Sequence, residues 1–361
     1  MQEKAHSLKK RSDSHFFKKG LIIAILSGMT YGLYTGFVTL GMSKGIWGSD
    51  WYGANMSGLS VFAITYVLAA LGCAVNDFVS AIWMVIKCVY LGEFKDFLSV
   101  LKTKPAWVMI VLAIIGGPIA STCYIAAIQL AGPVSVPFAA LNAAIGAMIG
   151  HFAFKQELNK RMVLGIIICF LSVSVIGGTT FDGFGTTTML GICLALVCSI
   201  GWGIEGAVGG FGTVLIDYNV GITIRQCTSA IGNICVLLPI LCLIDGNGLN
   251  PVNLFSTALF DSSILIFLIS GLFSGLSFGF WYKGASMCGA ALCMTCNCAY
   301  AFWGPLFTWI ICGLIDGGVG YGMTPIQWIF AGVMIGGIAL VGDLNPLNLI
   351  RKKTNKEEAA T

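Results

Sequence analysis

Charged side chains are scarce in this chain. Only 10% of its 361 residues are Asp, Glu, Lys or Arg, whereas 57% are hydrophobic. Soluble domains carry about 25% charged residues, so this composition excludes a soluble globular protein. The apolar runs repeatedly reach the roughly 20 residues that a helix needs to cross a ~30 Å hydrocarbon core. The sequence therefore predicts an all-α, polytopic integral membrane protein.

Catalytic motifs are missing as well. The chain has no HExxH pair, no spaced Asp dyad and no Ser nucleophile with an evident base. Its GxGxxG-like strings precede neither a strand nor a soluble helix, so they do not indicate nucleotide binding. We therefore expect neither an enzyme nor a resident cofactor, and the sequence carries no nucleic-acid motif.

Fourteen cysteines are present, and four of them fall in the run MCGAALCMTCNC at 287–298. Thiolates are soft metal ligands, but the run has no second CxxC pair and no His, and it lies inside an apolar segment. Free Cys commonly behaves as a small apolar residue. We expect the thiols to pack between helices and to bind no metal. Glycines at four-residue spacing, such as Gly28-x-x-x-Gly32 and Gly332-x-x-x-Gly336, similarly predict close helix approach.

Hydrophobic runs predict about ten membrane spans. They cover residues 20–43, 59–92, 106–131, 134–153, 162–178, 189–209, 220–244, 263–287, 289–315 and 326–342. No cleavable signal is evident before the first span, because its apolar stretch is longer than a signal core.

Basic residues sort to one side of these spans. Sixteen of the twenty Lys and Arg residues lie in the tails 1–19 and 344–361 or in the loops 93–105 and 154–161. The opposite loops hold no Lys or Arg but contain four acidic residues, Asp182, Asp245, Asp261 and Asp316. Because cytoplasmic segments are enriched in Lys and Arg, we expect both termini in the cytoplasm, most simply in a plasma or inner membrane, with the basic tails facing lipid headgroups.

Two halves of the chain share local patterns. Residues 20–178 and 189–343, joined by an external linker at 179–188, each read as five spans. Superposing them pairs Tyr31 with Trp202 and Tyr34 with Glu205. Since five is odd, the second half enters the membrane from the opposite side. Such inverted repeats are typical of secondary transporters, whose site lies near mid-membrane between the halves.

The repeats are not equal in length. The offset between matched residues is 171 for Tyr31 and Trp202 but 149 for Ser80 and Ser229, which locates an insertion of about 22 residues near 45–67 in the first half. We expect either a long second helix that projects from the membrane or a short surface or re-entrant segment.

The first half contains three further short patterns: Tyr124-x-x-Ala127, the run Lys155–Leu158, and Val163–Ile168 followed by Gly177. Together with ten spans in two inverted repeats, they resemble the drug/metabolite transporter superfamily, EamA-type branch. Glu157 stands where the family has the Glu of a Gly-Glu pair, although Gln156 replaces the Gly; the second half departs further at 313–316. The resemblance covers roughly residues 19–343. It implies alternating access to a central cavity lined mainly by the first, third and fourth spans of each repeat.

Charges inside predicted spans point to a site, because each costs at least ~2.5–3.5 kcal/mol near a helix centre. Glu205 follows Trp202 by three residues, so both lie on one helix face, and Tyr31 and Tyr34 have the same spacing in the other repeat. These four residues predict an aromatic box with one negative charge. Further candidates for the substrate site are Tyr124, Tyr282, Asn142, Tyr300 and Trp303.

An aromatic box with a carboxylate suits an organic cation such as a choline-like amine. Alternatively, Glu205 pairs with Lys283 or Arg225, or titrates as a proton-coupling carboxylate. Asp77 and Arg225 fall one position apart when the repeats are superposed, which makes them candidates for a gating ion pair or for snorkelling at span ends.

We therefore expect a secondary transporter that moves a small metabolite, with a proton or another ion as coupling partner. An organic cation is one substrate class; a neutral sugar, nucleoside or amino acid is the alternative. A membrane receptor or scaffold without transport is the alternative of another class.

Overall fold

The computed structural model describes residues 2–53, 58–154, 159–178, 185–288 and 290–341. All regular structure in these residues is helical, which confirms the all-α class. Seven helical segments are long and apolar enough to cross a membrane: Phe16–Gly41, Ala63–Tyr90, Lys104–Ala139, Thr186–Val208, Tyr218–Asp245, Ile264–Cys288 and Cys293–Ile315. Three predicted features lie outside the described residues: Glu157, which matches the Glu of the family's Gly-Glu pair, the C-terminal tail from 344, and most of the linker 179–188.

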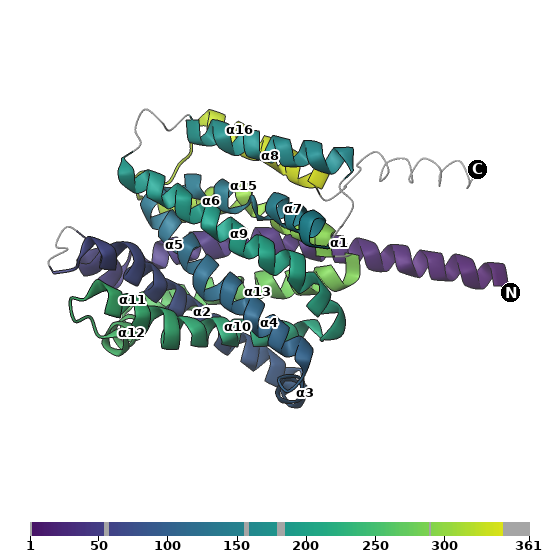
Figure 1. The fold of residues 1–361 in the computed structure, drawn as a ribbon, viewed down its shortest axis with the longest axis horizontal. Coiled ribbons are helices and arrows are strands. Elements are labelled where there is room, and N and C mark those ends of the chain that lie inside the picture. The colour runs from purple at the N-terminus through teal and green to yellow at the C-terminus, as the bar shows by residue number, and fades with distance from the viewer. Residues whose placement is uncertain (1, 54–57, 155–158, 179–184, 289, 342–361) are drawn as a thin grey trace.

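Three of the seven segments lie in the first half of the chain. Its elements are α1 (Gln2–Gly41), η1 (Trp47–Trp51), η2 (Ala63–Val67), α2 (Leu68–Tyr90), α3 (Phe94–Val100), α4 (Lys104–Ile114), η3 (Ile115–Ile119), α5 (Ala120–Ala131), η4 (Gly132–Val134), α6 (Ser135–Ala139), α7 (Asn142–Phe154) and α8 (Lys160–Gly178). The predicted basic tail is the start of α1, since this helix begins at Gln2 and projects from the bundle in Figure 1.

The second half of the chain is helical as well. Its elements are α9 (Thr186–Leu215), α10 (Tyr218–Gly232), η6 (Asn233–Leu237), α11 (Leu238–Asp245), α12 (Pro251–Phe260), α13 (Ile264–Cys288), α14 (Ala290–Asn297), α15 (Tyr300–Thr308), η7 (Trp309–Ile315) and α16 (Pro325–Val341). Turns η2, η3, η6 and η7 are π-helical and continue the α-helices next to them. Such π-turns are frequent at functional sites.

Helices from the two halves interleave. α1 packs against α13, α14 and α15, while α9 packs against α4, α5, α6 and α7. α2 packs against α10 and α13, and α10 packs against α4. α8 and α16 form a separate pair along one side of the bundle (Figure 1). α1 and α9 thus hold central positions, each surrounded mainly by helices of the other half.

Close approach of α1 to its neighbours depends on glycines such as Gly28 and Gly32. A Cβ at Gly28 would lie 2.7 Å from the Asn297 carbonyl oxygen, and one at Gly32 would lie 2.6 Å from Trp303 Cβ. The predicted role of this glycine row is therefore confirmed. The same prediction for Gly332 and Gly336 is wrong: in the part of the chain that is described, no atom lies within 4 Å of a Cβ at either position. These two glycines lie on a helix surface that no described element covers.

The described residues of the insertion form a cap on one end of the bundle. We define the cap as residues 42–53 and 58–62. Its short turn η1 buries Trp47 completely, with the indole 5.6 Å from the Phe267 ring of α13. The next helix begins at residue 61 and continues through η2 into α2. The described part of the insertion thus combines a short packed segment with an extended start of the second-span helix.

Acidic residues of the second-half loops hold this cap. Lys44 Nζ lies 2.5 Å from Asp316 Oδ1, and the Ile46 amide donates to Asp261 Oδ2 at 3.2 Å. Ser60 Oγ donates to Asp245. The cap therefore joins the first half to three separate loops of the second half.

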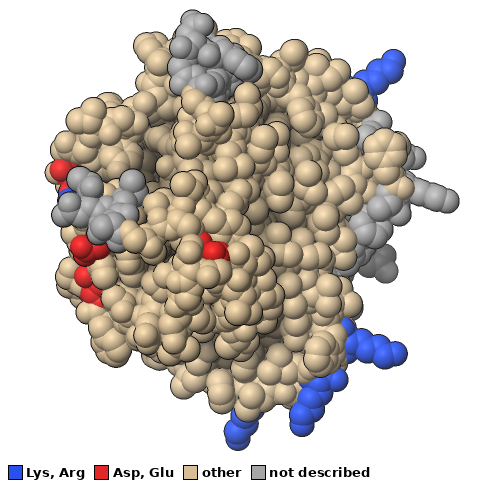
Figure 2. Space-filling view, turned by 60° about the vertical axis from the view of Figure 1, so that its left-hand side comes forward, with Lys and Arg blue, Asp and Glu red and all other residues tan. Residues whose placement is uncertain are grey.

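Surface charge lies at the two ends of the bundle. In Figure 2 most acidic side chains gather at one end and most basic side chains at the other, with a broad uncharged band between them. The described basic residues of the predicted cytoplasmic segments are exposed: Lys18, Lys19, Lys95, Lys102, Lys104, Lys160 and Arg161.

Candidate functional site

A cluster of aromatic rings occupies the centre of the bundle. Tyr31 of α1 lies 4.6 Å from Tyr300 of α15 and 5.6 Å from Trp202 of α9, measured between ring centroids. Tyr34 and Tyr124 extend the cluster at 5.1 Å and 5.7 Å from Tyr31. All five rings are buried. The predicted aromatic pairing between the first helices of the two halves is therefore present.

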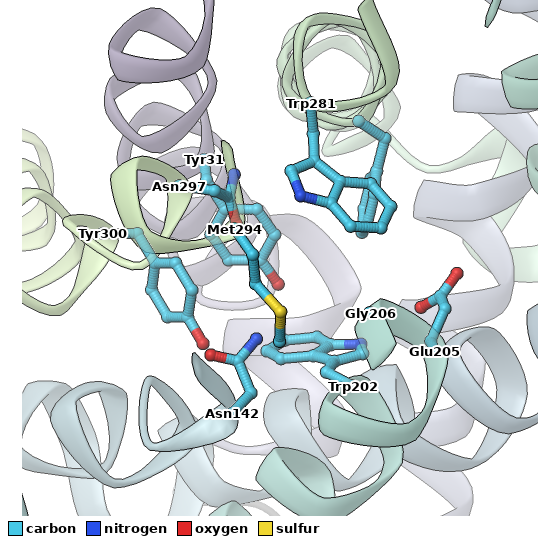
Figure 3. Close-up of a pocket in the computed structure, with 10 residues that line it drawn as sticks. Tyr31, Asn142, Trp202, Glu205, Gly206, Trp281, Met294, Asn297 and Tyr300 are labelled. Atoms are coloured by element: carbon cyan, nitrogen blue, oxygen red, sulfur yellow. The ribbon is translucent and has the colours of Figure 1, made fainter. Parts of the chain in front are cut away.

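A small cavity of about 30 Å³ lies beside this cluster. A cavity needs roughly 10–15 Å³ to hold one water molecule, so in this arrangement the space is of water size. Its lining, shown in Figure 3, consists of Tyr31, Asn142, Trp202, Glu205, Gly206, Phe278, Trp281, Met294, Asn297 and Tyr300. These residues come from both halves of the chain, on α1, α7, α9, α13, α14 and α15.

The carboxylate at this cavity is paired. Arg225 of α10 donates through Nε to Glu205 Oε1 at 2.9 Å and through Nη2 to Oε2 at 3.3 Å. The Arg225 guanidinium also lies 3.5 Å from the centroid of Phe278 and donates to Gln226 at 2.6 Å. Both charged side chains are at least 95% buried. A forked pair of this kind is strong and fixed in geometry, so Glu205 presents a compensated charge to the cavity.

The π-turn η3 makes room for Glu205 and Trp202. Pro118 lies within this turn, and the Gly116 carbonyl accepts a hydrogen bond from Trp202 Nε1 at 2.8 Å. A side chain at Gly116 would collide with the Glu205 carboxylate, because the nearest atoms to a Cβ there are those of the carboxyl group. A glycine and an opened helix turn therefore fix both the indole and the carboxylate of the site.

No model of a known protein family matches this chain, and no curated protein is similar to it. One solved structure, described only as the crystal structure of a protein, superposes on it with a TM-score of 0.53. The superposition covers 88% of this chain and 96% of that chain at 18% sequence identity. Likeness at this identity concerns the fold alone.

Most predicted site residues meet at the cavity. Five of the nine line it directly: Tyr31, Asn142, Trp202, Glu205 and Tyr300. Tyr34 and Tyr124 stand behind them in the aromatic cluster, where Tyr124 shares a 2.7 Å hydrogen bond with Thr35. Tyr282 and Trp303 do not line the cavity: Tyr282 packs against Trp281 and near Gly221, and Trp303 stacks on Phe307 at 5.8 Å.

The predicted pairing of Asp77 with Arg225 is not made. Arg225 bonds to Glu205, while Asp77 bonds to Ser229 and Asn233. Asp77 and Arg225 are offset by one position when the two halves are superposed, and successive residues of a helix point about 100° apart. The two side chains therefore face different neighbours. Both are buried, so neither snorkels at a span end.

Sequence reasoning missed Phe278 and Trp281 of α13. Their spacing of three places both on one helix face, and this face lies toward the cavity. The repeat pattern directed attention to Tyr282, one position further along. Met294 was missed because a flexible apolar side chain carries no motif; its end fits between Gly146 and Gly206, where a Cβ would lie 2.9 Å and 2.6 Å from Met294 Cε.

Proposed function

We propose that this protein is a secondary transporter that moves a small solute by alternating access. The observation that carries the proposal is the central cavity, whose aromatic walls come from helices of both halves. Glu205, one member of a buried ion pair of the second half, also lines it. A ring-shaped or planar solute stacks favourably on such walls. A receptor or scaffold with the same bundle would bind a ligand without moving it.

Reciprocal helix packing supports the inverted repeat of the proposal. α1 packs on α13 as α5 packs on α9, and α2 packs on α13 as α4 packs on α10. The second helices, α2 and α10, pack on each other, as do the last helices, α8 and α16. A two-fold axis between the halves produces this pattern. We further propose that the chain spans the membrane ten times, with α7, α8 and α16 as the additional spans. Kinship with drug/metabolite transporters of the EamA type is part of the same proposal.

Charge at the two ends of the bundle supports the orientation. With the basic end facing the cytoplasm, both termini lie inside, and the acidic loops and the cap face outward. A plasma or inner membrane is the simplest location for this arrangement.

The ion pair between Glu205 and Arg225 favours a solute without net charge. Glu205 already binds a cation, the Arg225 guanidinium, which also rests on the Phe278 ring. An organic cation must displace Arg225, leaving that charge buried without a partner. A solute without net charge needs no such exchange and gains hydrogen bonds from Asn142 and from the Tyr300 hydroxyl, which has no partner among the described residues. We therefore favour a neutral or zwitterionic solute, such as a sugar, nucleoside or amino acid.

Thermal unfolding of the purified protein in detergent tests the binding part. A ligand present at ~100 times its dissociation constant stabilises the folded state by about 2.7 kcal/mol. The panel contains sugars, nucleosides, amino acids and choline-like cations. We expect a net-neutral compound to raise the unfolding temperature and Tyr300→Phe to reduce the shift. Tyr282→Phe is the matched control, since that buried tyrosine lies outside the cavity.

Uptake into proteoliposomes tests the transport part. The stabilising compound should enter vesicles that contain the protein and exchange with unlabelled compound on the other side. Binding without uptake would favour the receptor or scaffold. Stabilisation by cations alone would reject the neutral solute class and restore the cation box.

A further inference from the structure

Asp77 is a buried carboxylate outside the cavity. It lies near the middle of α2 with 3% of its surface exposed, and it does not line the solute cavity. Ser229 of α10 donates to its Oδ2, and Asn233 Nδ2 of η6 donates to the same oxygen at 3.1 Å. Its Oδ1 receives a single long contact, 3.4 Å from Asn76 Nδ2. The carboxyl group is therefore saturated at one oxygen and open at the other.

Neutral side chains surround Asp77 on most sides. Asn233 also bonds to Thr122 of α5, and Asn76 accepts a hydrogen bond from Ser270 of α13 at 2.6 Å. The titratable or charged groups that face Asp77 are Cys73 on its own helix, Arg225 on α10 and Tyr34 on α1. Of these three, Arg225 carries the charge, and its bonds go to Glu205 and Gln226.

A charge count within the bundle then leaves one negative charge in excess. The buried charged side chains of the described residues are Asp77, Glu205 and Arg225. The single guanidinium of Arg225 can neutralise one carboxylate, and its hydrogen bonds go to Glu205. An uncompensated charge in a protein interior is neutralised by proton uptake rather than carried.

We propose that Asp77 is a proton-binding site that couples proton movement to the solute cavity, an inference that rests on the transporter function proposed above. The proton sits on Oδ1, and Oδ2 serves as the carbonyl oxygen that accepts from Ser229 and Asn233. This site is separate from the solute cavity and reaches it through Arg225.

Proton release changes the ion pair at the cavity. The O–H bond of the Asp77 acid breaks, the proton passes to water, and the carboxylate retains the electron pair. Two carboxylates then compete for the Arg225 guanidinium. Gln226 connects the two sites, since it accepts from Arg225 at 2.6 Å and donates to Ser80, one helical turn after Asn76 and Asp77. Deprotonation of Asp77 therefore weakens the hold of Arg225 on Glu205 and alters the cavity wall.

Infrared spectroscopy of the full-length protein in lipid tests the site without any solute. At neutral pH exposed carboxyl groups are ionised, so the C=O stretching band of a protonated carboxyl reports a buried acid. We expect this band in the wild type, a shift of the band to lower frequency when aspartate is labelled with carbon-13 in its side-chain carboxyl, and loss of the band in Asp77→Asn.

A second variant keeps the test valid should Asp77→Asn not fold. Ser229→Ala removes one hydrogen bond to Asp77 Oδ2 and should move the band to higher frequency. A missing band in the wild type overturns the proposal, as does a band that does not respond to labelled aspartate, because Glu205 is then the protonated acid. If the wild-type protein shows the band but takes up no solute into vesicles, the transport function is rejected and the proton-binding site at Asp77 is retained.

Discussion

At the scale of single residues, a buried guanidinium is stable only while its carboxylate stays with it. Arg225 and Glu205 are both buried and joined by two hydrogen bonds. Removing one member of such a pair costs about 3–5 kcal/mol, whereas replacing both is often nearly neutral. We predict that Arg225→Gln lowers the free energy of unfolding by about 3 kcal/mol, measured by thermal and chemical unfolding in detergent.

The double variant Glu205→Gln/Arg225→Gln is the control for this prediction. It removes both charges and keeps amides of similar size, so it should recover most of the stability lost in the single variant. If the double variant is as unstable as Arg225→Gln, the cost comes from packing on Phe278 and from the bond to Gln226, and the ion pair is not its source.

Met294 sets the size of the cavity. A Cβ at Gly206 would lie 2.6 Å from both the Sδ and Cε atoms of Met294, and because the thioether end is flexible it would move into the open space. We predict that Gly206→Ala folds but binds the solute at least tenfold more weakly, measured by ligand-induced thermal stabilisation. Gly332→Ala, where nothing lies within 4 Å, is the matched control and should bind normally.

Shortening Met294 should reverse this effect. Gly206→Ala/Met294→Ala restores the open space and should regain most of the affinity. An unchanged affinity in Gly206→Ala would mean that the solute does not reach this wall.

At the scale of elements, the cap is held by a carboxylate that titrates outside the membrane spans. Burial opposes ionisation of Asp261, but hydrogen bonds from Ser263 and from the Ile46 amide outweigh it, so the pKa of Asp261 is lowered. A lowered folded-state pKa gives stability that is present above the unfolded value of ~3.9 and is lost as the pH falls through the folded value.

We therefore predict that the unfolding temperature falls in this acid range and that Asp261→Asn makes the fall shallower. Asp96→Asn, at an exposed position of α3, is the control and should follow the wild type. Identical pH profiles for wild type and Asp261→Asn would show that the cap does not depend on this charge.

The helices were predictable because their apolar runs are long, but their interruptions were not. Pro118 indicates a break in the third span, yet no pattern shows that a π-turn there presents the Gly116 carbonyl to Trp202. The cap was located from the unequal repeat offsets. Its packing on α13 through Trp47 depends on tertiary contacts that no local pattern encodes.

Superposing the two halves of the sequence predicted some of the cavity-lining residues correctly and others wrongly. Superposing the first helices brought Tyr31, Trp202 and Glu205 together before their positions were known, and all three line the cavity. The partner of Glu205 remained open between Lys283 and Arg225, because which of them reaches α9 depends on how α13 and α10 are rotated in the bundle. Tyr282 was included through its repeat match to Tyr124 and Trp303 through its type, and neither lines the cavity.

At the scale of the whole molecule, the reciprocal packing connects the cavity with the proposed motion. α1 and α9 carry the first aromatic residues of each half, and each is surrounded by helices of the other half. A relative rotation of the halves therefore moves Tyr31 against Trp202 and changes access to the cavity from both ends. The cap joins the halves at one end through Asp245, Asp261 and Asp316.

The number of crossings distinguishes this arrangement from a simpler one. Seven helical segments of the described chain qualify as spans by length and composition, and an odd number places the two termini on opposite sides. Ten spans, with the shorter helices of the fourth and fifth positions included, place both termini on the same side. We predict that reporters fused at residues 1 and 361 are both cytoplasmic and that a reporter in the cap is external. Termini on opposite sides would remove the inverted repeat and, with it, the symmetry on which alternating access depends.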